Sequence, residues 1–152
     1  DSENLTTLKL NFTADGVTKT FAFKDLDGIG GNAPVVDNIS LDANKTYNVT
    51  VQVLDESKSP AEDITTEIEE ENFEHLFVHT PTPSNLLTIT RTDKDNRNLE
   101  VGLKASAVTT NAGTGTLRVV LYHQPPQNGV PIKDGTAKGS TDFDAQFNVT
   151  IK

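Results

Sequence analysis

Hydrophobic and polar side chains alternate along much of this chain, and this period of two constrains its fold more than any other feature. Successive side chains of a β-strand point to opposite faces of the sheet, so strict alternation marks strands with one buried face. The pattern is clearest at residues 8–12, 47–53, 117–121 and 143–151. Shorter strands are predicted at residues 35–41, 76–79, 86–91 and 101–108.

Turn residues separate these segments. Asp15-Gly16 stands between the alternating runs that end at Phe12 and begin at Phe21, which predicts a hairpin. Eight or nine short strands with Gly, Pro, Asn and Asp between them predict an all-β fold, an antiparallel sandwich of the immunoglobulin-like type. The 152 residues are expected to form one domain over residues 1–152.

One segment breaks the alternation. Ser59, Pro60 and Glu62 have the spacing of a helix N-cap, a first helical residue and a capping box. Apolar or aromatic side chains then recur at helical spacing, at Ala61, Ile64, Ile68 and His75. The sequence therefore predicts one inserted acidic helix over about residues 60–74.

Acidic residues crowd into this predicted helix, and no Lys or Arg occurs between Ser59 and Thr90. Glu67 and Glu71 form a like-charged i, i+4 pair, which costs about 0.2–0.5 kcal/mol. With His75 at i+8, three potential metal ligands line one edge of the buried stripe. A bound cation or a basic partner would relieve the repulsion. A solvated acidic face that ends in a hydrogen-bonded His75 is the alternative.

His123 has the same strand parity as Leu121 and is expected to point toward the core at the end of its strand. A neutral imidazole there suits zinc, copper or haem iron, and a structural, hydrogen-bonded histidine is the alternative. If the helix packs over this strand end, His75, Glu71 and His123 converge, with Glu67 beside them. Two imidazoles and a carboxylate favour zinc. His79, four residues after His75, is a weaker candidate.

Two acidic loops carry the spacing of a calcium site. Asp25, Asp27 and Asn32 place oxygen ligands in the first loop, and residues 93–98 do so in the second, with two basic residues among them. Neither loop fits the EF-hand template, and ordinary turn chemistry also explains Asp, Asn and Gly at these positions. Calcium and haem are therefore alternatives to zinc.

Composition excludes several classes of protein. The chain has no Cys, so disulfide scaffolds, thiolate zinc sites and Cys nucleophiles are excluded. A net charge of −9 disfavours nucleic acid and anionic lipid as partners. No apolar run approaches the roughly 18 residues of a membrane span. No nucleophile–base motif or phosphate-binding loop is present, so we expect that the protein is not an enzyme.

Several segments resemble those of a known family: residues 21–34, 54–71, 74–77, 113–125 and 139–151. They are similar to small exported lipoproteins of the Bacteroidota that are labelled "type 1 periplasmic-binding-fold" and encoded near TonB-dependent outer-membrane receptors. The resemblance implies a cell-envelope lipoprotein, outer-membrane-anchored, whose only membrane attachment is a lipid anchor that this chain does not carry. It implies nutrient capture for such a receptor. An accessory subunit that docks through its acidic helix or a sheet edge is the alternative.

Overall fold

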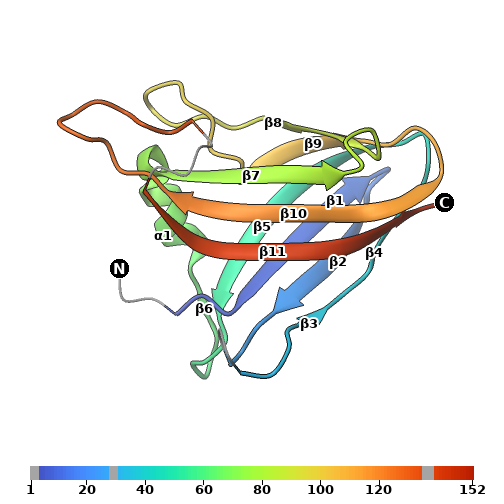
Figure 1. Cartoon of the computed structure of the whole chain (residues 1–152), viewed down its shortest axis with the longest axis horizontal. Helices are drawn as coiled ribbons and strands as arrows, with labels where there is room; N and C mark the ends of the chain where they lie inside the picture. The colour runs from blue at the N-terminus through green and yellow to red at the C-terminus, as the bar shows by residue number, and fades with distance from the viewer. Residues whose placement is uncertain (1–3, 28–30, 135–138) are drawn as a thin grey trace.

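The computed structural model describes residues 4–27, 31–134 and 139–152 as two β-sheets packed face to face, with a short helix at one end (Figure 1). The larger sheet has the order β3-β2-β1-β5-β9-β8, with β6 paired to β5, and the smaller has the order β4-β11-β10-β7. The strands are β1 Thr7–Ala14, β2 Val17–Lys24, β3 Val35–Val36, β4 Ile39–Leu41, β5 Thr46–Asp55, β6 Glu62–Asp63, β7 His75–Thr82, β8 Thr88–Arg91, β9 Lys104–Val108, β10 Gly113–His123 and β11 Ser140–Ile151. The all-β prediction is confirmed, with eleven strands in the described residues where eight or nine were expected.

The predicted first hairpin forms because its alternation and its turn agree. β1 and β2 pair with Leu10 opposite Phe21. Asp15 and Gly16 between them have φ values of 54° and 76°, and positive φ at both central residues suits a two-residue hairpin turn. On its other side β1 pairs with β5, where Leu10 lies opposite Val51.

The core lies between the two sheets and is built from the alternating residues. Leu8, Leu10 and Phe12 are fully buried, as are their counterparts on the smaller sheet, among them Val119, Leu121, Ala145 and Phe147. Phe23 of the larger sheet packs edge-to-face against Phe147, with ring centroids 6.2 Å apart. The long strands of both sheets therefore show the burial that the alternation predicted.

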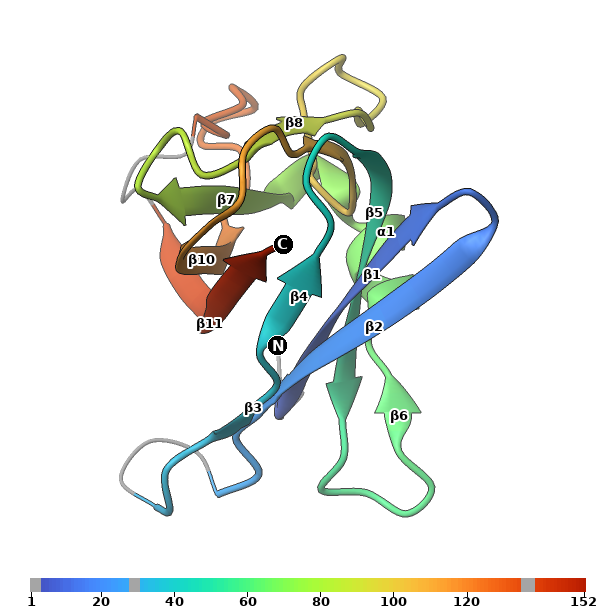
Figure 2. The same cartoon turned by 90° about the vertical axis from the view of Figure 1, so that its right-hand side faces the viewer.

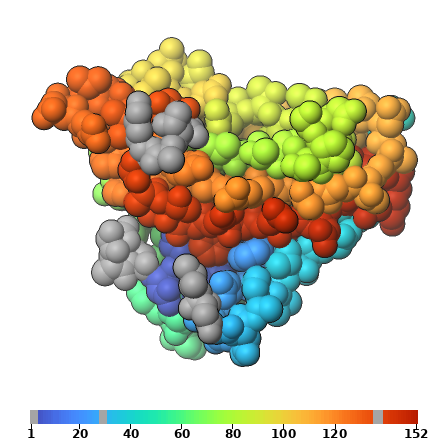
Figure 3. Space-filling view, in the orientation of Figure 1, coloured from blue at the N-terminus to red at the C-terminus, as the bar shows by residue number. Residues whose placement is uncertain are grey.

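β11 differs from the antiparallel prediction because its C-terminal end pairs in parallel with β4, from Val149 opposite Ile39 to Ile151 opposite Leu41. Figure 2 shows β4 beside the C-terminal end of β11. In the described part of the chain, no strand pairs with this edge of β11 before Val149. In the space-filling view β11 runs across one face of the molecule, next to β2 (Figure 3).

The predicted helix over residues 60–74 is wrong at its start and in its length. Glu62 and Asp63 form β6, which pairs with β5, so the Ser59-Pro60 signal does not begin a helix. The amide of Ile64 still donates to Val53 O at 2.9 Å, and α1 covers only Thr65–Glu70. A 3-10 turn, Asn72–Glu74, follows. Pairing with the edge of β5 has overridden the local capping signal, as tertiary contacts commonly do.

Candidate functional site

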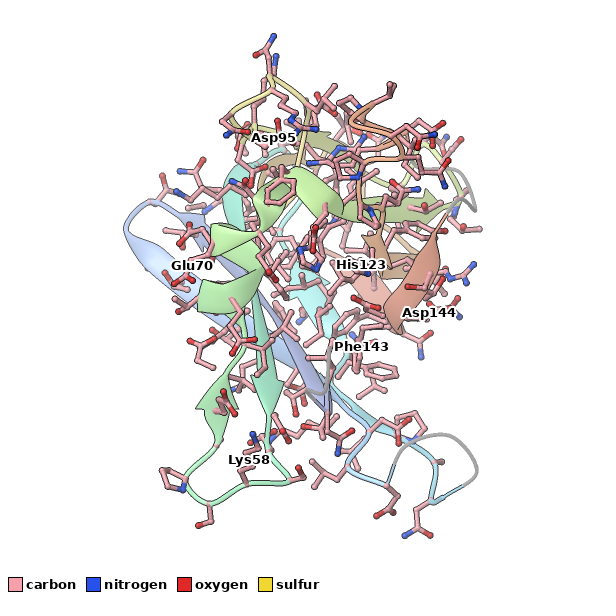
Figure 4. All side chains as sticks on the ribbon, turned by 90° about the vertical axis from the view of Figure 1, so that its left-hand side faces the viewer. Lys58, Glu70, Asp95, His123, Phe143 and Asp144 are labelled. Atoms are coloured by element: carbon pink, nitrogen blue, oxygen red, sulfur yellow. The ribbon has the colours of Figure 1, made fainter. Side chains whose placement is uncertain are left out.

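His75 and His123 lie directly opposite each other on neighbouring strands, at the start of β7 and the end of β10. Their rings stack with centroids 5.1 Å apart and planes at 27°. The strand pairing brings them together because β7 begins where the 3-10 turn ends, which places His75 over the end of β10. His123 is seen at the end of the sandwich where α1 lies (Figure 4).

The side chain of His75 is only 6% exposed, and its tautomer is fixed by a backbone contact. Nδ1 lies 2.9 Å from Glu71 O, and since a carbonyl only accepts, Nδ1 carries the hydrogen. The lone pair of the neutral ring is therefore on Nε2. Burial lowers the pKa of His75, and the hydrogen bond to Glu71 opposes this without cancelling it. A neutral His75 with Nε2 available is the state that a metal ion requires.

Glu74 supplies the carboxylate that contacts His123, where the sequence analysis expected Glu71 and Glu67. His123 Nε2 lies 3.0 Å from Glu74 Oε1, so Nε2 donates to the carboxylate. Glu71 meets His75 through its backbone carbonyl, and its side chain is exposed. Glu67 lies one helical turn earlier and accepts the Glu71 amide through its own carbonyl. The two acidic residues after α1 thus hold the histidines, Glu71 through its backbone carbonyl and Glu74 through its carboxylate.

Asp142 belongs to the site although sequence reasoning did not single it out. Leu121 pairs with Phe143 and Tyr122 pairs with Thr141, so Asp142 is the extra residue of a bulge in β11. A bulge bends its strand and redirects a side chain. Asp142 Oδ2 lies 4.0 Å from His75 Nε2, on the side where the ring has its lone pair.

These two side chains line a pocket of about 250 Å³, which we call the histidine pocket. Its other walls come from the N-terminal segment, from α1 and the residue before it, and from β10, and comprise the polar Asn4 and the apolar Leu5, Ile64, Ile68 and Leu121. A second pocket of about 270 Å³ adjoins it and shares Leu5 and Asp142 as walls. We call the second one the phenylalanine pocket, because Phe23 and Phe143 line it.

His79 lies outside this site. Its Nε2 lies 3.0 Å from Gly102 O, and its buried Nδ1 has no hydrogen-bond partner among the described residues. Burial lowers its pKa. From its position in β7, His79 therefore packs against the segment before β9, away from His75 and His123.

The side chains of the two loops considered for calcium contact other groups in the structure. Asn32 Nδ2 donates to Asp27 Oδ2 at 2.9 Å, while Asp25 lines the phenylalanine pocket; residues 28–30 of this loop lie outside the described residues. In the second loop the ammonium of Lys133 lies 2.9 Å from Asp95 Oδ2, with side chains 1% and 0% exposed. The ammonium group of Lys133 is thus already paired with the carboxylate that a calcium ion would need.

In the parts of the chain that the structure describes, no three side chains of His, Cys, Asp or Glu are grouped so that they hold a metal ion by themselves. His75 and Asp142 form a pair of donors, and His123 is turned to Glu74. Among the described helices none is long and apolar enough to cross a membrane. Comparison with family models, curated proteins and solved structures gives no significant match to this chain.

Proposed function

We propose that this chain is a non-enzymatic binding protein of the bacterial cell envelope that captures a metal-bearing nutrient, with zinc as the favoured ion. The observation that carries the proposal is the pairing of His75 Nε2 with Asp142 Oδ2, 4.0 Å apart in a pocket. A hydrogen bond from the other ring nitrogen to a carbonyl is the usual support for a metal-binding histidine, and Glu71 O provides it.

The number of donors favours a metal that arrives with ligands of its own. Zinc takes four ligands, and structural sites supply all four from the protein. The histidine pocket offers one imidazole and one carboxylate, so two positions are left for donor atoms of a small molecule or for water. The ring of His123 stacks on that of His75 with planes 27° apart and bonds to Glu74 through Nε2, so in this proposal it supports His75 and is not counted among the zinc ligands. Reversible coordination without a chemical step is the resulting mechanism.

The cellular location of the protein is part of the same proposal. We expect an outer-membrane lipoprotein with a lipid anchor that delivers its ligand to a neighbouring TonB-dependent receptor, and the resemblance of the sequence supports this. The proposal also includes an immunoglobulin-like subtype for the sandwich, because sandwiches of this type carry binding sites at one end. Calcium or haem are alternatives if zinc fails.

The test is calorimetric titration of the metal-free protein with zinc chloride and with a 1:1 zinc–bipyridine complex. We expect His75→Ala and Asp142→Asn to abolish binding, and the complex to bind more tightly than the bare ion. Glu71→Gln is the matched control, because Glu71 acts through its carbonyl and its side chain is exposed. Retained binding in both pocket variants, or no heat with either probe, would sink the proposal.

A docking role for an outer-membrane complex is the second candidate, and the unpaired edge of β11 favours it. The backbone N–H and C=O of Lys152 form hydrogen bonds with the chain at and just after β4. Because this direction alternates along a strand, the backbone groups of Asn148 and Gln146 point toward the same edge of β11, where no described strand pairs with them. Such an edge accepts an added strand. Substitution of Gln146 by Pro should then abolish binding to the purified receptor while His75→Ala leaves it unchanged, and the reverse result favours ligand capture.

A further inference from the structure

The phenylalanine pocket has a chemistry that differs from that of the histidine pocket beside it. It lies between the start of β11 and the end of β2, and its lining combines two aromatic rings, one leucine, one threonine and three carboxylates: Phe23, Phe143, Leu5, Thr141, Asp25, Asp142 and Asp144. No Lys, Arg or His is among the described residues that line it. At about 270 Å³ it lies below the usual range of about 300–1,000 Å³ for drug-sized ligands, so it suits a smaller molecule.

The aromatic wall is already assembled. Phe23 and Phe143 come from opposite sheets and contact each other edge-to-face, with centroids 5.8 Å apart and planes at 88°. Phe23 is buried, whereas Phe143 is partly exposed at the pocket. Such a pair presents both apolar surface and a ring face with negative potential, which attracts a cation within about 6 Å.

Asp25 provides the most specific signal for the ligand. Its Oδ1 is buried and has no hydrogen-bond partner among the described residues. An acceptor removed from water without a donor is costly, so a ligand N–H gains the missing hydrogen bond once the carboxylate of Asp25 turns this oxygen toward the pocket that the residue lines. Asp144 does not have this property, because Arg118 holds it through two hydrogen bonds of 2.9 and 2.6 Å.

We propose that the phenylalanine pocket binds a primary ammonium group carried on a short apolar chain, with the ammonium at Asp25 and Asp142 and the chain against Phe143. A bare metal ion fits less well, because hard cations require six or more oxygen ligands and apolar rings form much of this wall. This inference goes beyond the proposed metal capture. It shares Asp142 with the zinc pair, whereas Asp25 and Phe143 take no part in that pair.

The test is an NMR titration of the isotope-labelled protein with n-butylammonium chloride, followed by amide shifts, with 1-butanol as the neutral probe of similar shape. We expect saturable shifts centred on residues that line the pocket, and affinity at least tenfold higher for the amine than for the alcohol. Asp25→Asn should weaken amine binding at least tenfold, and Phe143→Ala should weaken it as well.

Glu69→Gln is the matched control, because it removes one exposed negative charge on α1, as Asp25→Asn removes one in the pocket. It should leave amine affinity unchanged. His75→Ala should abolish zinc binding and keep amine binding, which separates the two proposals. Equal affinity for the amine and the alcohol, equal effects of Asp25→Asn and Glu69→Gln, or shifts that do not saturate would each overturn the inference.

Discussion

Lys133 and Asp95 form a buried ion pair whose removal gives the sharpest test of how this fold is held together. Lys133 Nζ donates to Asp95 Oδ2 at 2.9 Å and to Asn72 O at 2.8 Å. Asp95 Oδ1 accepts from the amides of Arg97 and Leu99. The pair thus ties three segments together: the loop after β8, the 3-10 turn before β7 and the segment before β11. Lys133→Met removes the charge and keeps most of the aliphatic stem.

The expected cost is large because Asp95 is left with its charge inside the protein. Burial opposes ionisation of Asp95, but the hydrogen bonds from Lys133 and from the amides of Leu99 and Arg97 outweigh it and lower the pKa of Asp95. The side chain of Lys133 is 1% exposed and that of Asp95 is 0% exposed. Removing one member of such a pair costs about 3–5 kcal/mol of unfolding free energy. The double variant Lys133→Met, Asp95→Asn should return close to wild-type stability, since replacing a whole buried pair is often neutral.

The assay is urea unfolding at pH 7 by far-ultraviolet circular dichroism, with linear extrapolation. With slopes of about 1–3 kcal/mol per molar urea, the single variant should unfold at least about 1 M earlier than the wild type. Lys104→Met is the control, because Lys104 is exposed, and surface changes stay within about 0.5 kcal/mol. A Lys133→Met midpoint equal to that of the control, or a double variant as unstable as the sum of the singles, would refute the reasoning.

Two further predictions follow from the buried histidine and from the close approach of β7 to β10. Because burial lowers the pKa of His75, its contribution to stability is complete above the unfolded value of about 6.5 and is lost as pH falls toward the folded pKa. The drop in urea midpoint between pH 7 and pH 5 should therefore be smaller in His75→Gln than in the wild type, and equal drops would contradict this. Gly115→Ala should cost about 1–3 kcal/mol, because its Cβ would lie 2.1 Å from Thr82 O, whereas Gly113→Ala meets only Leu86 at 3.6 Å and should be milder in the same thermal scan. Equal melting temperatures for the two glycine variants would contradict that packing.

The long strands could be predicted because a single physical rule determines them. One face of each sheet is buried, and the side-chain period of a strand is two, so residues such as Leu10, Val51 and Phe147 identify their strands by alternation alone. The hairpin turn at Asp15 and Gly16 could be predicted for a similar reason, since few residues accept positive φ. The parallel pairing of β4 with β11 could not, because alternation is the same for parallel and antiparallel neighbours.

The helix shows where a local signal is insufficient. Ser59, Pro60 and Glu62 satisfy the rules for a helix start, yet Glu62 is in β6 and Ile64 is still bonded to Val53. A capping box is worth roughly 1 kcal/mol, and pairing with an open strand edge competes with it. The predicted apolar stripe was nevertheless correct at Ile64 and Ile68, which are 2% and 3% exposed. The sequence pattern therefore predicted the burial of these side chains more reliably than it predicted whether they lie in a helix or a strand.

The candidate site was partly accessible to sequence reasoning for the same reason. Strand parity pointed His123 toward the core, and the helical stripe ended at His75, so both histidines were identified, and the strand register then places them opposite each other. Asp142 was missed because the alternation that begins at Phe143 assigns even-numbered residues to the solvent face. A bulge exists only where two strands of known register are paired, so no property of the segment around Asp142 alone reveals it. Since Asp142 is a wall of both pockets, this one extra residue in β11 gives each of them a carboxylate. The segment predicted as an acidic helix contributes the apolar walls Ile64 and Ile68, the carbonyl of Glu71 and the carboxylate of Glu74.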